Sequence, residues 1–263
     1  MKHRKLKNIF LGLVLFFLYL PIIILIIYSF NSSKMNIVFE NFTFSWYKNL
    51  FYNKELLEAF FNTMIIAITS TVLSTIIGVI SAVGLNKYEF KLKKIINILI
   101  YIPIVIPEIV LGISLLSMYT LVKLDLGMFT LILSHIAFSI PYVIVSVRSS
   151  LSESSKNYEE AAYDLGASKF QTFFRVTLPL IMPGVISGAT LAFTLSMDDV
   201  VISYFTAGPG SNTLPLKIYS MIKTGITPDV NAMSTLLLIA TIIILTASVM
   251  IQGRKIAKNG GVA

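Results

Sequence analysis

Three carboxylates stand inside long apolar stretches of this sequence and are its clearest candidates for chemistry. Glu108 falls near the middle of the run 95–121, and the adjacent Asp198 and Asp199 fall in the run 178–205. An acidic residue at the centre of a membrane helix costs roughly 2.5–3.5 kcal/mol on insertion scales. Such residues usually face a water-filled or protein-lined interior and mark a pathway. Negative charge there suits a cationic solute, because a carboxylate can replace part of the water that an ammonium group loses.

The same residues also allow a structural interpretation. A carboxylate could pair with His135, or with a lysine of a neighbouring chain, and so hold a helix bundle together. Asp198 and Asp199 would point about 100° apart on a helix, so one is expected to face the pathway and the other a helix interface. Ser196 could hydrogen-bond to a solute amine or pack between helices. A lone histidine with scattered carboxylates lacks the ligand spacing of a metal site, and no catalytic residue is expected.

The single tryptophan, Trp46, lies in a mixed polar and aromatic segment beside Phe44 and Tyr47. Tryptophan is enriched where a membrane protein meets the membrane–water interface, so an interfacial anchor is the favoured interpretation. The alternative is a cation–π contact with an incoming ammonium group, which keeps Trp46 among the candidate pathway residues.

One long polar stretch separates two apolar runs and carries the other candidate site. Asn157 with Glu160, and Ser168 with Gln171, have the three-residue spacing of capping boxes. Gly166 between them suits a left-handed C-terminal helix cap. The spacing predicts a helix–glycine–helix element on the membrane surface. Capping signals alone would equally suit an ordinary loop that links two spans.

Composition sets the class of protein. The 263 residues are 56% apolar and 13% charged, with a mean hydropathy of +0.82, whereas a soluble domain is about 25% charged. The chain is therefore predicted to be an all-α integral membrane protein. It has no cysteine, and hence no disulfide or thiolate metal site. The net charge of +8 clusters beside apolar runs, which argues against nucleic acid, and no phosphate-binding loop of the G-x-x-x-x-G-K-[ST] type occurs.

Hydropathy divides the chain into six expected spans, and charge gives their orientation. A signal peptide would have an apolar core of only about 7–15 residues, so the longer first run is predicted to be a retained span. Of the 21 Lys and Arg residues, 15 fall on the side that holds both termini and the polar stretch. The positive-inside rule makes that side cytoplasmic. The expected spans are about 9–30, 62–85, 95–121, 129–147, 178–205 and 232–251.

The polar stretch resembles the signature cytoplasmic loop of ABC importer permeases in residue type and in spacing. The resemblance implies a type I ABC importer permease fold, in which residues 157–176 form a coupling helix that docks on an ATPase subunit. Val176 stands where the family usually has isoleucine. The residues that match the motif, and that the resemblance assigns to ATPase coupling, are Glu160, Ala161, Ala162, Gly166, Leu178 and Pro179.

A further resemblance, to the spermidine/putrescine permease family, covers most of the chain. It implies the second of two permease subunits, paired with a homologous permease. It also implies a cytoplasmic ATPase dimer that binds ATP and Mg²⁺, and an extracytoplasmic binding protein that delivers the polyamine. Residue 169 is lysine where a relative in that family has an acidic residue, so no carboxylate role is carried over there. The stretches that match are Pro21–Ser33, Pro107–Ser114, Leu195–Ser203 and Leu214–Met221.

Together these patterns predict one permease domain, residues 1–263, in a bacterial plasma membrane. It is expected to form half of a polyamine pathway, to catalyse no reaction and to hold no cofactor. Two alternatives stay open. One is an ABC permease for another cationic or metal solute. The other is a secondary transporter that uses a pathway carboxylate as a proton relay. The latter predicts uptake without an ATPase and leaves the Glu-Ala-Ala loop unexplained.

Overall fold

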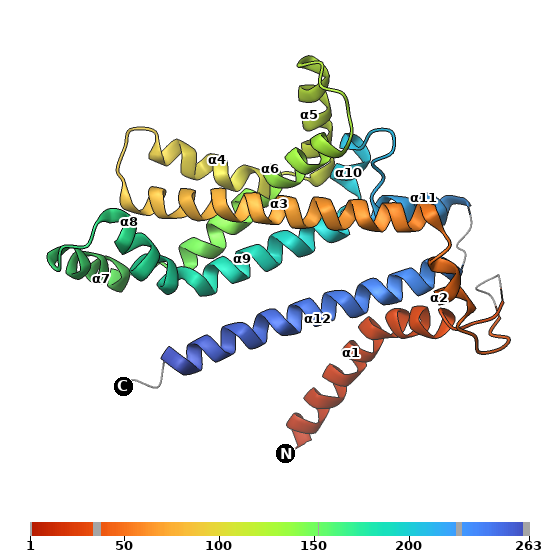
Figure 1. The fold of residues 1–263 in the computed structure, drawn as a ribbon. Helices are drawn as coiled ribbons and strands as arrows, with labels where there is room; N and C mark the ends of the chain where they lie inside the picture. Colours follow the sequence, from red (N-terminus) through yellow and green to blue (C-terminus); the bar gives the residue numbers. More distant parts are fainter. Residues whose placement is uncertain (1, 34–37, 152, 225–227, 260–263) are drawn as a thin grey trace. The chain divides into compact units, whose positions relative to one another are not determined.

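The computed structural model describes residues 2–33, 38–151, 153–224 and 228–259, and apart from one isolated bridge the regular secondary structure of these ranges is helical (Figure 1). This architecture confirms the all-α fold class. In chain order the helices are α1 (Lys2–Tyr28), α2 (Ser45–Leu50), α3 (Lys54–Lys87), α4 (Lys93–Val105), α5 (Glu108–Leu121), α6 (Met128–Ser149), α7 (Glu153–Asp164), α8 (Lys169–Thr172), the π-helical turn η1 (Phe173–Thr177), α9 (Leu178–Asp198), α10 (Val201–Thr206), α11 (Leu214–Thr224) and α12 (Pro228–Asn259).

Several of these helices are long and apolar enough to cross a membrane. Four described stretches qualify by length and composition: Leu6–Tyr28, Lys54–Lys87, Met128–Ser149 and Lys169–Asp198. The bent pair α4 and α5 would make a fifth span. The apolar part of α12 within the described ranges, Pro228–Ile243, is shorter. The chain is thus a multi-pass membrane protein, and the count of six spans stays a prediction.

Two of the expected spans are broken at the residues that carry charge. Ile106 is extended (ψ 137°) and Pro107 has no N–H to donate, so α4 ends there. The chain bends by 111° between α4 and α5. Figure 1 shows α5 turning away from α4. In the fifth expected span, the extended backbone of Asp199 (φ −64°, ψ 126°) ends α9. Glu108 and Asp198 therefore stand at helix ends, whereas the sequence pattern placed Glu108 near the middle of a span.

The chain forms two compact units, Met1–Leu57 with Ile218–Ile243 and Glu58–Lys217 with Ile244–Ala263. The boundaries fall within α3, α11 and α12, so the units share helices and are not joined by a linker.

In the first unit, Asn31 organises the segment that follows α1. Its side chain is buried, donates to the carbonyl oxygen of Val38 (2.7 Å) and accepts from the amide of Glu40 (2.9 Å). Asn31 also forms an isolated antiparallel bridge with Phe42. The Trp46 indole N–H donates to the Asn31 carbonyl oxygen, which fixes α2 against this segment.

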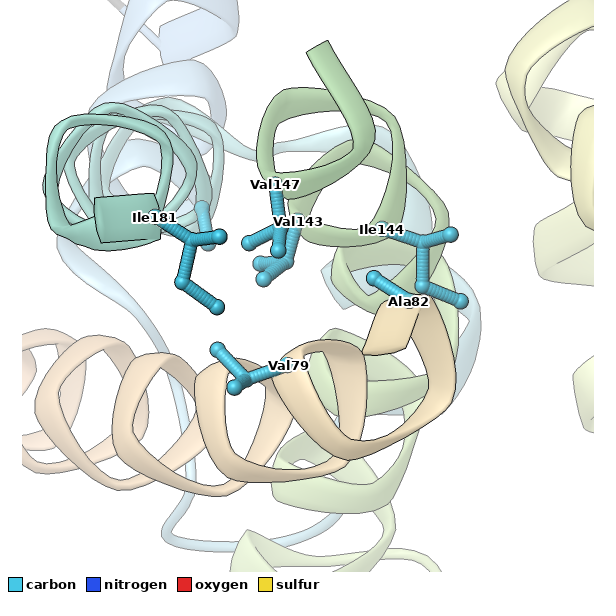
Figure 2. Packing of buried hydrophobic residues seen from close by; sticks show 7 residues of the cluster. Val79, Ala82, Val143, Ile144, Val147 and Ile181 are labelled. Carbon is cyan, nitrogen blue, oxygen red and sulfur yellow. The ribbon is translucent and has the colours of Figure 1, made fainter. Parts of the chain in front are cut away.

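The core of the second unit lies between α3, α6 and α9. Figure 2 shows Val79 of α3 and Ile181 of α9 pointing toward Val143 and Val147 of α6. Lipid tails are as apolar as these side chains, so close van der Waals packing is what holds such helices together in a membrane. The buried members of this cluster are Val79, Ala82, Val143, Ile144, Val147, Ile181 and Ala192.

Two glycines allow α9 to approach α6 at backbone distance. A Cβ added to Gly184 would lie 2.5 Å from Ser150 Oγ and 2.6 Å from the Ser146 carbonyl oxygen. One added to Gly188 would lie 3.1 Å from Val143 Cα. Small residues four apart are the usual device for such contacts between membrane helices. This pair therefore positions α9, which ends at the candidate site.

Candidate functional site

A cavity of about 290 Å³ in the second unit brings together the three carboxylates that the sequence singled out. Glu108 comes from the first turn of α5, Asp198 from the last turn of α9, and Asp199 from the residue after it. Phe138 and Tyr142, one turn apart on α6, add aromatic walls. Carboxylates attract cations directly, and aromatic faces attract them through the ring quadrupole. The cavity can therefore hold a cation that also has apolar methylene groups.

Glu108 and Asp198 present their carboxylates to this cavity. Both residues are exposed. Within the described ranges, neither side chain forms a hydrogen bond or an ion pair with another residue. Glu108 is stabilised by the positive end of the α5 dipole, whereas Asp198 stands at the negative end of α9. The chain therefore offers little positive potential to offset the negative charge of Asp198, and this favours a bound cation.

Asp199 is only 8% exposed, and its carboxylate is used inside the chain. One oxygen accepts from the amide of Ile202 (3.1 Å), and the other from the amide and hydroxyl of Ser203 (both 2.7 Å). His135 Nε2 lies 3.5 Å from the same second oxygen. Asp199 therefore caps the start of α10 and anchors it to α6, since side-chain oxygens accept from free amides at helix N-termini.

His135 extends this contact into a buried network across four helices. Its Nδ1 lies 2.6 Å from Ser196 Oγ, and its Nε2 lies 3.2 Å from Ser203 Oγ. Ser196 Oγ is in turn 3.3 Å from Ser70 Oγ on α3. A neutral imidazole with its proton on Nε2 satisfies these contacts, because Ser196 can donate to Nδ1 and Ser203 can donate to Asp199. The structural alternative offered by the sequence, in which a carboxylate pairs with His135 inside the helix bundle, therefore applies to Asp199.

Two candidate pathway residues lie away from the cavity lining. Ser196 is 2% exposed and faces the network behind the cavity. Trp46 belongs to the first unit, where its indole N–H is bonded to the Asn31 carbonyl oxygen. The predicted roles of these two residues toward a solute stay predictions.

The polar stretch folds as the predicted helix–glycine–helix element. α7 ends at Asp164, and Gly166 follows in the left-handed conformation (φ 82°). The amide of Ser168 donates to Gln171 Oε1, and the amide of Gln171 donates to Ser168 Oγ, which confirms the second capping box. The first predicted box is wrong, because α7 begins at Glu153 and places Asn157 inside the helix.

The outer face of this element carries three of the six predicted coupling residues. Glu160, Ala161 and Gly166 are exposed. Leu165 is 89% exposed and Phe170 is 73% exposed, which is unusual for apolar side chains on a polar loop. Such a face suits a protein partner. Of the remaining predicted coupling residues, Ala162 and Leu178 are half-buried and Pro179 is exposed at the start of α9.

The inner face of α7 is tied to the rest of the second unit through Glu159. Lys87 Nζ lies 2.7 Å from Glu159 Oε2, and Thr177 Oγ1 donates to Glu159 Oε1 at 2.5 Å. Lys87 also donates to Tyr163 Oη (2.8 Å). Burial alone would raise the pKa of the Glu159 carboxyl. The hydrogen bonds from Lys87 and Thr177 and the charge of Lys87 outweigh it, so that pKa is lowered.

Sequence reasoning missed the residues whose roles depend on distant partners. Phe138 and Tyr142 have a detectable signal, since positions four apart share a helix face. Ser203 could have been found from the capping spacing after Asp199, had the break in the fifth span been expected. Lys87 and Glu159 are 72 residues apart and give no local signal. Among the described residues, no group of three or more His, Cys, Asp or Glu could hold a metal ion.

Apolar helices that cross a membrane, a cavity with carboxylates between them and an exposed polar loop are features of a transport permease. Residues 74–258 match the family model described as binding-protein-dependent transport system inner membrane component. The chain belongs to this family, whose members are membrane permease components of ABC importers.

Curated relatives match along nearly the whole chain. The spermidine/putrescine transport system permease protein PotC of Escherichia coli (strain K12) is 43% identical over 258 residues, which covers 98% of each chain. The protein of the same name from Haemophilus influenzae is 39% identical over 251 residues, 95% of this chain and 98% of that one. The putrescine transport system permease protein PotI of Escherichia coli (strain K12) is 40% identical over 229 residues, 84% of this chain and 82% of that one.

Solved structures share the fold at lower identity. A chain of a bacterial ABC transporter involved in the import of the acidic polysaccharide alginate aligns with a TM-score of 0.71 and 18% identity, covering 93% of this chain and 94% of that one. A chain of the MetNI methionine ABC transporter aligns with a TM-score of 0.61 and 20% identity, covering 76% of this chain and 94% of that one.

Proposed function

We propose that this chain is a permease subunit of an ATP-driven importer of polyamines, such as spermidine or putrescine. It forms half of the translocation pathway together with a homologous permease. Its exposed loop couples the pathway to an ATPase dimer, which binds ATP and Mg²⁺. An extracytoplasmic binding protein delivers the solute, and both termini of this chain lie in the cytoplasm.

The proposal rests on the full-length similarity to permeases that are named for spermidine and putrescine. The cavity agrees with that substrate class. A polyamine carries ammonium groups separated by methylene chains, and Glu108 and Asp198 offer charge while Phe138 and Tyr142 offer apolar walls. An acidic polysaccharide, as imported by the alginate transporter that shares the fold, would be repelled by the same cavity.

The carboxylates would act by replacing water around the passing cation. At a separation of 4 Å, two opposite unit charges attract by about 4 kcal/mol at an effective dielectric constant of 20. Two carboxylates from different helix ends can serve successive ammonium groups of one polyamine. Asp199 would act indirectly, because its bonds to His135 and Ser203 fix the chain reversal that presents Asp198 to the cavity.

The exposed loop supplies the link to ATP hydrolysis. Glu160, Leu165 and Phe170 offer one charge and two large apolar side chains on a single surface element. Central apolar anchors with a flanking charge are typical of a protein–protein docking surface. Closure of the ATPase dimer would move this loop and turn the cavity toward the outside, where the loaded binding protein releases its solute.

Uptake of radiolabelled spermidine tests the substrate class and the pathway together. The chain is assembled in vesicles with its candidate partners, and wild type is compared with Asp198→Asn, with and without ATP inside. We expect ATP-dependent uptake that falls by roughly tenfold in the variant, the factor that corresponds to about 1.4 kcal/mol. Lys123→Gln, which changes a charge at an exposed turn outside the cavity, is the matched control and should transport normally.

Each alternative function gives a different result. Uptake that ignores ATP would overturn the ABC mechanism in favour of a secondary transporter. If spermidine is not taken up while another loaded binding protein stimulates ATP hydrolysis, the polyamine is wrong and the coupling loop is retained.

A further inference from the structure

Glu159 and Glu160 are neighbours on α7, yet they lie on different sides of that helix and differ in exposure. Glu160 is exposed on the face proposed to meet the ATPase. The Glu159 side chain is 15% exposed and is bonded to Lys87 and Thr177. Adjacent helical residues point about 100° apart. One face of α7 can therefore meet a partner while another face contacts the rest of this chain.

The contacts of Glu159 join three elements at one point, here called the Glu159 joint (Lys87, Glu159 and Thr177). Lys87 is the last residue of α3, and Thr177 is the last residue of η1, directly before α9. Thr177 is 2% exposed, so its hydroxyl has the Glu159 carboxylate as its partner inside the protein. The joint thus connects α7 to the ends of two long helices.

Both helices continue from the joint to the candidate site. α9 runs from the residue after Thr177 to Asp198, 21 residues or about 32 Å at the helical rise. α3 carries Ser70, which contacts Ser196 in the network behind the cavity. A displacement of α7 that is passed through the joint therefore reaches the cavity along two packed helices, which are rigid elements.

The π-helical turn η1 makes this region suited to movement. It spans Phe173–Thr177, between α8 and α9, and its wider winding interrupts the regular hydrogen-bond ladder of the stretch 169–198. Such turns often occur at functional sites in helices. Because Thr177 is the last residue of η1, its hydrogen bond to Glu159 anchors the point where the loop passes into α9.

We propose that the Glu159 joint transmits the displacement of the loop to α3 and α9, with Lys87, Glu159 and Thr177 as positioning residues. The inference rests on the proposed function, in which the loop couples to an ATPase. Removal of the joint would leave Glu160 and the outer face free to dock. ATP hydrolysis would then continue while the cavity responds less to it.

The test measures spermidine uptake and ATP hydrolysis on the same vesicles, with the chain in its full assembly. The variants are Lys87→Met, Glu159→Gln and the charge exchange Lys87→Glu with Glu159→Lys. We expect the two single variants to hydrolyse ATP within about twofold of wild type, while uptake per ATP falls roughly tenfold, within the usual range of allosteric coupling. The charge exchange should restore most of the uptake per ATP, since it rebuilds the ion pair with reversed charges.

A matched control comes from the neighbouring ion pair of Lys93 with Glu89. That pair also involves a lysine, the first residue of α4, and has an Nζ–Oε1 distance of 2.6 Å, but it joins residues only four apart. Lys93→Met should keep uptake per ATP unchanged. If uptake and ATP hydrolysis fall in proportion in Lys87→Met and Glu159→Gln, the joint has only a structural role and the inference is wrong. If wild type shows no ATP-dependent uptake, the proposed function itself fails.

Discussion

Two pairs of adjacent acidic residues share one arrangement in different surroundings. They are Asp198–Asp199 beside the cavity and Glu159–Glu160 in α7. In each pair one carboxylate is exposed and the other is bonded within the chain. Asp199 is held by backbone amides, hydroxyls and an imidazole, whereas Glu159 is held by the ammonium group of Lys87.

The difference follows from the surroundings of each pair. Asp199 is 8% exposed between apolar helices, where every additional charge carries a large desolvation cost. Hydrogen bonds from neutral groups stabilise a carboxylate there without a second charge. Glu159 lies at the edge of the helical bundle, and the Lys87 side chain is 34% exposed, so a charged partner remains partly solvated. In both places the bonded residue fixes the backbone that presents its exposed neighbour.

The largest expected effect is on stability, from Asp199→Ala. This change would remove the acceptor of the Ser203 hydroxyl and of the Ile202 and Ser203 amides, and with it the cap of α10; each buried donor left without an acceptor costs about 1–3 kcal/mol. Asp198→Ala is the matched variant and should change stability by less than about 0.5 kcal/mol, because its carboxylate is exposed. Thermal unfolding in detergent, followed by circular dichroism, measures both. Equal losses in the two variants would contradict the division of roles.

Glu160→Lys is expected to have an intermediate effect, on coupling and not on folding. The residue is exposed, so the chain should insert and unfold like wild type. Charge reversal on a docking surface places like charges together or removes an attraction, which alters recognition strongly. We expect uptake per ATP hydrolysed to fall at least tenfold, as measured by parallel assays of radiolabel uptake and phosphate release. Unchanged coupled uptake would rule out the docking role of Glu160.

The smallest expected effect is the pH dependence of the Lys87–Glu159 contact. The pKa of Glu159 is lower in the folded chain than its unfolded value of about 4.3. The contact therefore contributes its full stability above that unfolded value and loses it as the pH falls through the lower folded pKa. Since Lys87 is partly solvated, the contribution should be at most about 1 kcal/mol.

The difference in unfolding midpoint between wild type and Glu159→Gln measures this contribution. We expect a constant difference from pH 7 down to about 5, and a decline only below the usual range of glutamate. A difference that already shrinks between pH 7 and pH 5 would mean that the pKa of Glu159 is raised, against the contacts seen in the structure.

Sequence reasoning succeeded where a feature depends on neighbouring residues. Gly166 adopts the left-handed conformation and Ser168 forms its capping box with Gln171, because both depend on residues within one turn. The start of α7 was misjudged, since Asn157 can serve inside a helix as well as at its cap, and nothing local decides between the two.

The amino-acid sequence by itself determined that this chain is a helical membrane permease with acidic residues inside its apolar stretches and a helix–glycine–helix loop. These features follow from hydropathy, capping spacing and the family motif, all of which are local along the chain. Only the tertiary structure decided which acidic residue of each pair is bonded. The partners, His135 for Asp199 and Lys87 for Glu159, are brought close by helix packing, and the broken ends of α4 and α9 turn Glu108 and Asp198 toward one cavity.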